Sequence, residues 1–463
     1  MNAKPVQPLI ETINKVLQDG TSKGIKHIVP GTMRRHLAEN VYIFSGAKTN
    51  AQLRELSSLL SSEDGSLKPF SKFWKDAQKL HPKYNAAYLE AEYIYATQAA
   101  QMASKWSDFE QHGDRYNLQY RTAADARVRD THAILHNTTL AASDPFWDKY
   151  FPPNGWRCRC TVVQVRKSKY PESDSIQAQE NGSLSTEGKN SIFRFNPGKQ
   201  QVIFPEHHPY FKRLTDKEYE VIKDKAKEVF SVKTADDVVK IISDVSKDKG
   251  WFEHGFSKLD VTNVEGLNGS TNRKGTISLN KDKMEKTISG INKLSNGNSK
   301  DVTFEESDAM STFWHEITHN RNKKGIVFLA ERQTNHMELA NEFISRKTLS
   351  EFFEAFGAKV QHPELIKNRT STGYNAMVNN FQKIIDKTKL DKDKVVGVVK
   401  EHLFNEWYTD QKDGLTNALK GAKKADGKAI KKAEINSLIE YCVTLDEDIF
   451  EKYLQRLIRY EKR

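Results

Sequence analysis

The segment FWHEITHN, residues 313–320, most constrains what this chain can fold into. It places His315 and His319 four residues apart, with Glu316 directly after the first histidine. On an α-helix these histidines lie one turn apart on the same face, so both imidazoles can reach one metal ion. Glu316 lies about 100° around the helix from His315, near enough to take a proton from a metal-bound water. The segment therefore predicts a helix that carries a metal site.

The residues around this segment favour a helix. Thr303 and Glu306 have the T-x-x-E spacing of a capping box, and Gly325 follows where a helix can end. Four apolar residues have the helical spacing of a packing face: Met310, Phe313, Trp314 and Ile317. Zinc suits such a histidine pair, because it acts as a Lewis acid and lowers the pKa of a bound water.

The motif resembles that of the zincin metallopeptidases, a resemblance that implies Zn²⁺ as the cofactor and Glu316 as the catalytic base. The metzincin continuation is missing, because Asn322 stands where that pattern has glycine. The chain is more similar to zincins whose third ligand is a glutamate. The next helical stretch, HMELANEF, offers Glu338 and, one turn later, Glu342.

By this resemblance Glu338 joins His315 and His319 as a metal ligand. Glu342 then orients His315 by a hydrogen bond to the ring nitrogen that does not bind the metal. A pairing shifted by one helical turn remains an alternative. A donor for the transition state is also expected, and the sequence does not choose among four candidates: His336, Tyr374, His402 and Tyr408. The strand predicted at 275–280 lies where a zincin places the edge strand that aligns its substrate.

A second informative stretch, residues 116–165, contains the pair Cys158 and Cys160. Alternate residues of a strand share a face, so both thiols point the same way. With His132 or His136 they would form an incomplete zinc set. The interpretation we favour is that both cysteines are small buried packing residues. A disulfide between them would be strained. Residues 123–135 are predicted to form a charged helix.

This stretch resembles the phage Mu protein F family of minor head, or head-morphogenesis, proteins. The resemblance covers about residues 40–165 and includes the segment at 84–106. The matching residues are Tyr116 to Leu118, Asp125, Arg127, Arg129, His132, Asp144 to Trp147 and Pro152 to Cys160. It implies a phage or prophage protein in the capsid interior near the portal, acting in head assembly. It implies no catalytic residues in this part of the chain.

The charge of the chain fits such surroundings. Lysine and arginine number 72 against 61 acidic residues, which gives a net charge of +11. Four arginines of the Mu F-like stretch are candidates for contact with DNA phosphates or an acidic portal surface, although ordinary surface charge is the simpler interpretation: Arg127, Arg129, Arg157 and Arg159. The lysine-rich stretch 421–432 is interpreted as a solvated loop.

The predicted fold class is α+β and mainly helical. We expect a helical and β-containing head-morphogenesis domain at 1–166, a polar linker at 167–205, and a zincin-like domain with a small sheet and a helix bundle at 206–463. There are three cysteines, which suits a reducing compartment such as the bacterial cytoplasm. No secretory signal and no membrane span is expected.

Three functions from different classes remain open at this stage. The first is a head protein fused to an active zinc peptidase of unknown substrate. The second is a purely structural minor head protein whose zincin-like domain is inactive. The third is a prophage-borne toxin or effector that the head domain delivers.

Overall fold

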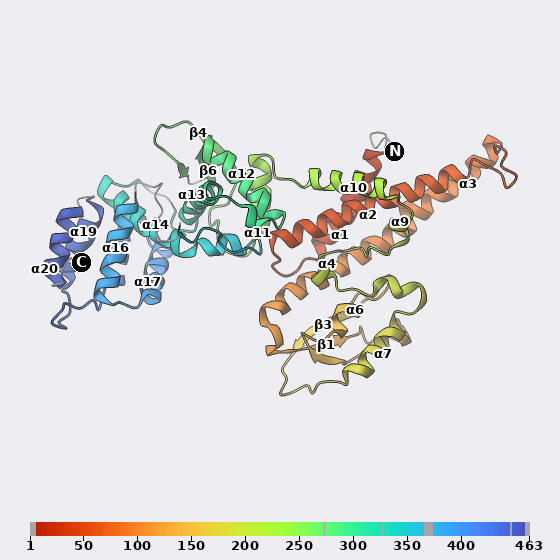
Figure 1. Ribbon diagram of the computed structural model, residues 1–463, viewed down its shortest axis with the longest axis horizontal. Helices are drawn as coiled ribbons and strands as arrows, with labels where there is room; N and C mark the ends of the chain where they lie inside the picture. The colour runs from red at the N-terminus through yellow and green to blue at the C-terminus, as the bar shows by residue number, and fades with distance from the viewer. Residues whose placement is uncertain (1–5, 273, 326–327, 365–373, 445–446, 459–463) are drawn as a thin grey trace. The chain divides into compact units, whose positions relative to one another are not determined.

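The protein divides into two compact units, Met1–Ser231 and Val232–Arg463 (Figure 1). The structure is a computed structural model, and it describes residues 6–272, 274–325, 328–364, 374–444 and 447–458. Helices dominate and each unit contains one small three-stranded sheet, which confirms the predicted mainly helical α+β class. None of the helices in these ranges combines the length and the apolar character needed to cross a bilayer.

The first unit is built on three long helices, among which α1 packs against both α2 and α4. Their shared core is rich in aromatic and aliphatic side chains, including Leu37, Phe44 and Tyr95. The helical segments of this part are α1 (Gln7–Gly24), α2 (Gly31–Ser58), α3 (Phe70–Pro82), the π-helical η1 (Lys83–Tyr88), α4 (Leu89–His112) and the short η2 (Gly113–Arg115). The sequence motif at 84–106 thus lies on η1 and α4.

The sheet of the first unit has β1 (Asn117–Arg121) in the centre, antiparallel to β2 (Thr139–Ala141) and β3 (Thr161–Val165). Leu118 and Tyr120 of β1 are buried in a core that also contains Trp147. Two short helices, α5 (Asp130–Ala133) and α6 (Phe146–Lys149), lie in the connections between these strands.

The helix predicted at 123–135 is wrong, because only α5 within it is helical. Ala124 has a φ of 53°, in the left-handed region that interrupts a helix. The Asp125 carboxylate accepts a hydrogen bond from the backbone N–H of Arg127 at 3.0 Å and pairs with both terminal nitrogens of Arg159 at 2.6 Å. These contacts favour a turn at Asp125 over a helix.

The polar stretch predicted as a linker, 167–205, is ordered and forms part of the first unit. It contains α7 (Ser175–Ser185), η3 (Gly188–Phe193) and α8 (Pro197–Gln200). Phe193, Ile203 and Phe204 are buried in the core of the long helices, which a flexible arm would not be. The following α9 (Pro209–Lys212) and α10 (Asp216–Val229) pack against α2, so the boundary between the units comes after residue 231.

The second unit begins with α11 (Ala235–Val245) and a sheet in the order β4-β6-β5. The predicted strand at 275–280 is β6 (Thr276–Asn280), which pairs parallel with β4 (Lys258–Thr262) and antiparallel with β5 (Gly269–Thr271). β6 is therefore the central strand of this sheet, not the edge strand predicted for it, and its edges are β4 and β5. The sequence did not identify β5 because it is three residues long and polar.

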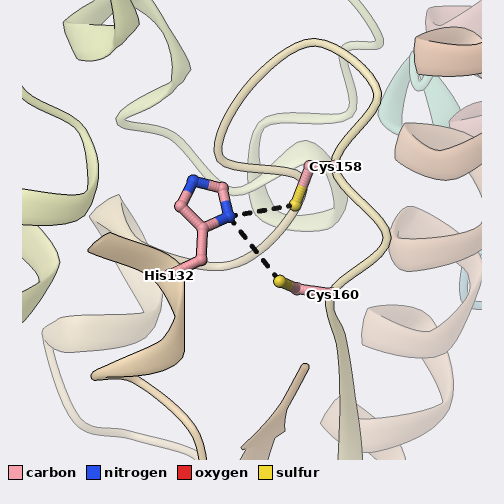
Figure 2. Close-up of side chains that lie close together, drawn as sticks. All are labelled: His132, Cys158 and Cys160. Carbon is pink, nitrogen blue, oxygen red and sulfur yellow. Dashed lines mark hydrogen bonds between the residues drawn. The ribbon is translucent and has the colours of Figure 1, made fainter. Parts of the chain in front are cut away.

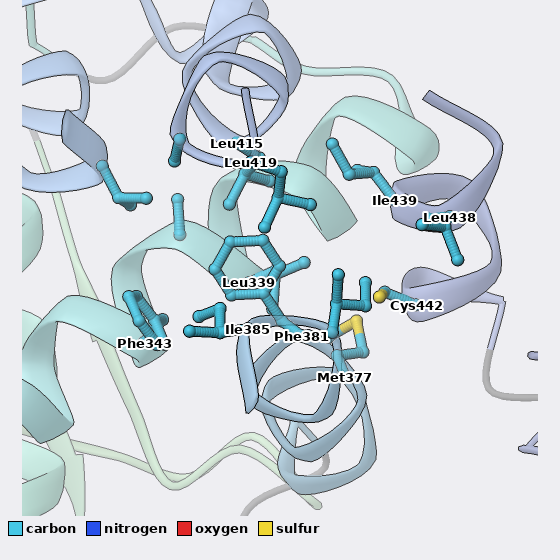
Figure 3. Close-up of a cluster of buried hydrophobic side chains, with 14 of the residues drawn as sticks. Leu339, Phe343, Met377, Phe381, Ile385, Leu415, Leu419, Leu438, Ile439 and Cys442 are labelled. Carbon is cyan, nitrogen blue, oxygen red and sulfur yellow. The ribbon is translucent and has the colours of Figure 1, made fainter. Parts of the chain in front are cut away.

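Helices form the rest of the second unit. Leu339 and Phe343 of α14 pack with Phe381, Leu415 and Leu438 in a bundle core (Figure 3). The segments are α12 (Lys281–Ser295), η4 (Ser299–Asp301), α13 (Phe304–Asn320), α14 (Glu331–Glu354), α16 (Asn375–Thr388), α17 (Lys392–Asn405), η5 (Tyr408–Asp410), α18 (Gln411–Ala418), α19 (Lys432–Val443) and α20 (Glu447–Ile458). A second core, which contains Phe313 of α13 together with Leu349 and Phe352 of α14, fixes α14 next to α13, where the predicted metal ligands lie.

Candidate metal centre

The predicted HExxH helix is α13. Its N-terminus carries the expected capping box, because Thr303 Oγ1 accepts from the Glu306 N–H and the Glu306 carboxylate accepts from the Thr303 N–H. His315, Glu316 and His319 lie in the last two turns, and all three are buried. The helix thus presents two imidazoles on one face, as the spacing predicts.

Glu338 of α14 completes a three-atom cluster with these imidazoles. The two Nε2 atoms of His315 and His319 are 3.1 Å apart, and Glu338 Oε2 lies 3.2 Å and 3.6 Å from them respectively. Ligand atoms about 2.0–2.1 Å from a tetrahedral zinc ion lie about 3.3–3.4 Å from one another. Glu338 Oε2 is buried and makes no hydrogen bond within the described residues. The spacing and the donor types therefore fit one zinc ion.

Each histidine directs Nε2 at the cluster and is oriented by a contact of its other ring nitrogen, Nδ1. His315 Nδ1 donates to Glu342 Oε2 at 2.6 Å, and the other oxygen of this buried carboxylate accepts from Arg346 Nε at 2.8 Å. His319 Nδ1 lies 3.3 Å from the Tyr408 hydroxyl, which itself donates to the His319 carbonyl at 2.9 Å. Because each Nδ1 has an acceptor, each Nε2 can direct a lone pair at a metal.

The carboxylates around His315 and His319 favour a positive charge between the three clustered atoms. Burial lowers the pKa of His315, but the neighbouring carboxylates of Glu338 and Glu342 outweigh burial and raise that pKa to about 10. Burial raises the pKa of Glu338, but the two histidines lower it to about 2. A proton on His315 balances the carboxylates, and a divalent cation at the same place would supply that charge instead.

A cleft of about 390 Å³ opens beside the cluster. The edge strand β5 forms one wall, and an added Cβ at Gly269 would lie 2.8 Å from Glu316 Oε1. The Asn320 amide donates to Thr271 Oγ1 at 2.7 Å and joins the end of α13 to this strand. The missing side chain of Gly269 thus allows the strand to pass directly against Glu316.

The structure divides the four candidate transition-state donors. Tyr374 and Tyr408 line the cleft, and the Tyr374 ring stacks on His315 with 6.0 Å between ring centroids. His336 lies 3.4 Å from Glu440, and His402 contacts the Asp410 carbonyl at 2.9 Å, so neither belongs to the cleft lining. The hydroxyl of Tyr408 is engaged by His319, which leaves Tyr374 as the better placed donor.

The arginines considered as DNA or portal contacts make hydrogen bonds and ion pairs within the first unit. Arg129 donates to the Trp156 carbonyl at 2.7 Å, Arg157 lies 3.2 Å from Glu90, and Arg127 and Arg159 both pair with Asp125. The contacts of Arg129 and Arg159 connect the segment before α5 to the segment before β3, and that of Arg157 reaches α4. They give the arginines a structural role that the sequence did not reveal.

Part of the first unit matches a known family. Residues 65–163, from the segment before α3 into β3, match the family described as "Phage Mu protein F like protein". Residues 65–163 are a Mu F-like region. The resemblance inferred from the sequence at 40–165 is thereby confirmed over most of its length.

Two curated relatives match over short lengths. The chain is 36% identical over 81 residues to "Putative capsid assembly protein F" of Escherichia phage Mu, which is 17% of this chain and 18% of that protein. It is 31% identical over 106 residues to the "Mu-like prophage FluMu F protein" of Haemophilus influenzae, covering 21% and 25% of the two chains. The chain thus spans a quarter or less of each relative. No solved structure matches it.

Proposed function

We propose that this chain is a minor head protein of a phage or prophage that carries a zinc-dependent peptidase in its second unit. The Mu F-like region and the capsid assembly protein that resembles it support the first part. The observation that carries the second part is the convergence of His315, His319 and Glu338 beside Glu316 in one cleft.

The head function is assigned to the first unit. Its partners are portal and capsid proteins, with non-specific contact to packaged DNA through the basic surface of the chain. The protein acts in the capsid interior near the portal and reaches it from the host cytoplasm, where heads assemble. The second unit is then an enzyme held inside the virion by the first.

The zinc ion would be held by His315 Nε2, His319 Nε2 and a Glu338 oxygen. When bound, it supplies a Lewis acid that polarises a peptide carbonyl and lowers the pKa of water. Glu342 and Tyr408 hold the two imidazoles in the ligating orientation. The orienting contacts come from α14 and η5, so the site depends on the packing of the second unit.

Glu316 acts as the general base and then as the acid. It removes a proton from the attacking water and delivers a proton to the leaving amine. The edge strand β5 binds the substrate backbone in an extended conformation, as sheet edges bind peptides. The hydroxyl of Tyr374 donates a hydrogen bond to the oxyanion that forms at the scissile carbonyl.

The test uses the purified full chain loaded with zinc and incubated with a bacterial lysate, whose new protein N-termini are identified by mass spectrometry. We expect new termini with the natural chain and a loss of about 10²- to 10⁴-fold in their rate of formation with Glu316→Gln. Glu305→Gln, an exposed change on the same helix, is the control and should retain the activity. Equal cleavage by the natural and Glu316→Gln chains would refute the peptidase.

Further outcomes separate the competing functions. If the natural chain binds zinc but generates no new termini from lysate or from isolated phage head proteins, the second unit is structural. If host growth stops on expression of the natural chain but continues with Glu316→Gln, the peptidase acts as a toxin. Head assembly that is normal without residues 65–163 would refute the head function.

A further inference from the structure

A second group of metal-ligating side chains lies in the first unit, far along the chain from the HExxH helix. His132 of α5 faces Cys158 and Cys160, which precede β3 (Figure 2). Each sulfur lies 3.7 Å from His132 Nδ1. All three side chains are less than 5% exposed. The other candidate histidine, His136, instead contacts the Thr122 hydroxyl and lies outside this cluster.

The distances fit a single zinc ion. Zinc binds a thiolate sulfur at about 2.3 Å and an imidazole nitrogen at about 2.0–2.1 Å, so in a tetrahedral site these atoms lie about 3.6 Å apart. Both observed sulfur to nitrogen distances are close to this value. The three ligand atoms all lie within 4.8 Å of one another.

Packing alone accounts poorly for this arrangement. A ring nitrogen has either one proton or one lone pair, so His132 Nδ1 makes one good hydrogen bond, yet two sulfurs face it. The other ring nitrogen, Nε2, is buried without a hydrogen-bond partner in the described part of the chain. A metal ion bound to the Nδ1 lone pair can be shared by both sulfurs, which a single hydrogen bond cannot.

We propose that His132 Nδ1, Cys158 Sγ and Cys160 Sγ bind one zinc ion that joins α5 to the start of β3. The Arg129 and Arg159 contacts described above already hold these two segments together, so the ligands are brought into place before the metal binds. A water molecule completes the tetrahedron, and binding releases the thiol protons to solvent. The role is structural, since both cysteines belong to the core around the sheet and His132 is buried beside them.

The first test measures metal in the full chain by elemental analysis and replaces zinc with cobalt. The double variant His315→Ala with His319→Ala removes the zinc of the second unit and should retain about one zinc ion per chain. Its cobalt form should show the near-ultraviolet charge-transfer absorption of a thiolate-bound metal. Neither observation requires a change in the cysteine cluster, so a folding defect there cannot obscure the result.

The second test changes the ligands. Cys158→Ser with Cys160→Ser, and separately His132→Asn, should each lose about one zinc ion per chain, and the cysteine variant should lose the charge-transfer band. Cys442→Ala is the matched control, because Cys442 is a buried cysteine of the bundle core in the second unit, and should retain both.

Three outcomes would overturn the site. The first is a His315→Ala, His319→Ala chain without zinc after purification in the presence of zinc. The second is a cobalt form without the thiolate band. The third is a mass lower by two hydrogens in the natural chain under reducing conditions, which would show a disulfide between Cys158 and Cys160.

Discussion

The two histidine clusters of this protein have equal numbers of ligand groups but very different surroundings. His315, His319 and Glu338 border a cleft that also contains Glu316 and Tyr374. Cys158 and Cys160 lie in the apolar core around the sheet of the first unit, and His132 is buried beside them. The ligand count alone therefore does not distinguish a catalytic site from a structural one.

The difference lies in what surrounds the ligands. A catalytic zinc needs an open coordination position, a base and a surface that binds substrate, and the roles proposed for Glu316 and β5 would supply the last two. A structural zinc needs ligands that are held in place and shielded, which the first unit provides. The choice of donors agrees with this, because thiolates suit a stable site whereas a carboxylate suits a Lewis-acidic one.

The largest expected effect is that one substitution abolishes zinc binding in the second unit and leaves zinc binding in the first unit unchanged. Glu338→Gln removes a ligand of the second unit, so its zinc affinity should fall by more than about 10²-fold. Titration of the cobalt-loaded chain with zinc measures this. The thiolate band of the first unit should remain, and loss of both signals together would show that the two clusters are not independent.

The next effect concerns the group behind His315. Glu342→Gln should lower the zinc affinity of the second unit about 10- to 100-fold, because it weakens the hydrogen bond that orients the ring and removes the negative charge that faces Arg346. Glu354→Gln, an exposed change on the same helix, should retain full affinity. An unchanged zinc affinity in Glu342→Gln would show that Glu342 does not orient His315, and that the roles assigned to Glu338 and Glu342 are wrong by one helical turn.

The units should also differ in their response to acid. Burial first, and the charge of Lys48 second, lower the pKa of His208 in the first unit to about 3. Below pH 6.5 the unfolded chain binds a proton at His208 that the folded unit does not, so this histidine alone should lower the free energy of unfolding by about 2 kcal/mol at pH 5, measured as the difference from His208→Gln. Hydrogen exchange of peptides from residues 6–231 measures this loss.

The matched variants for this prediction are neighbours. His208→Gln should remove most of the acid sensitivity, whereas the exposed His207→Gln should retain it. Equal acid sensitivity of the two variants would assign the effect to other groups.

The smallest effect concerns the strand beside the base. Gly269→Ala places a Cβ 2.8 Å from Glu316 Oε1 and 3.0 Å from its Cγ, so the base or the strand must move. We expect roughly a tenfold lower rate of peptide cleavage with unchanged zinc content. Gly397→Ala is the control, because nothing lies within 4 Å of the added Cβ. Activity equal to the natural chain would show that β5 does not position Glu316.

The sequence predicted well the part of the second unit's metal centre that lies on one helix. Helical spacing placed His315, Glu316 and His319 together, and the T-x-x-E pair at Thr303 marked the helix start, because both depend on residues within a few positions of each other. The resemblance to zincins supplied Glu338 and Glu342, whose roles as ligand and orienting group stay predictions that the geometry supports.

Long-range packing was not accessible in the same way. The polar composition of 167–205 indicated a linker. Three of its side chains, Phe193, Ile203 and Phe204, are instead buried in the core of the first unit. The edge strand β5 is too short to give a pattern, and Tyr408 reaches His319 only because η5 follows α17 into the same bundle.

The sequence by itself determined the mainly helical class, the position of the HExxH helix and the Mu F-like region, since these depend on local periodicity or on runs of adjacent residues. Only the tertiary structure decided between His132 and His136 as the partner of the two cysteines. It also placed Gly269 against Glu316 and Tyr374 beside His315. These choices depend on side chains that are distant in the chain, and spacing along the chain carries no information about which of them meet when the core closes.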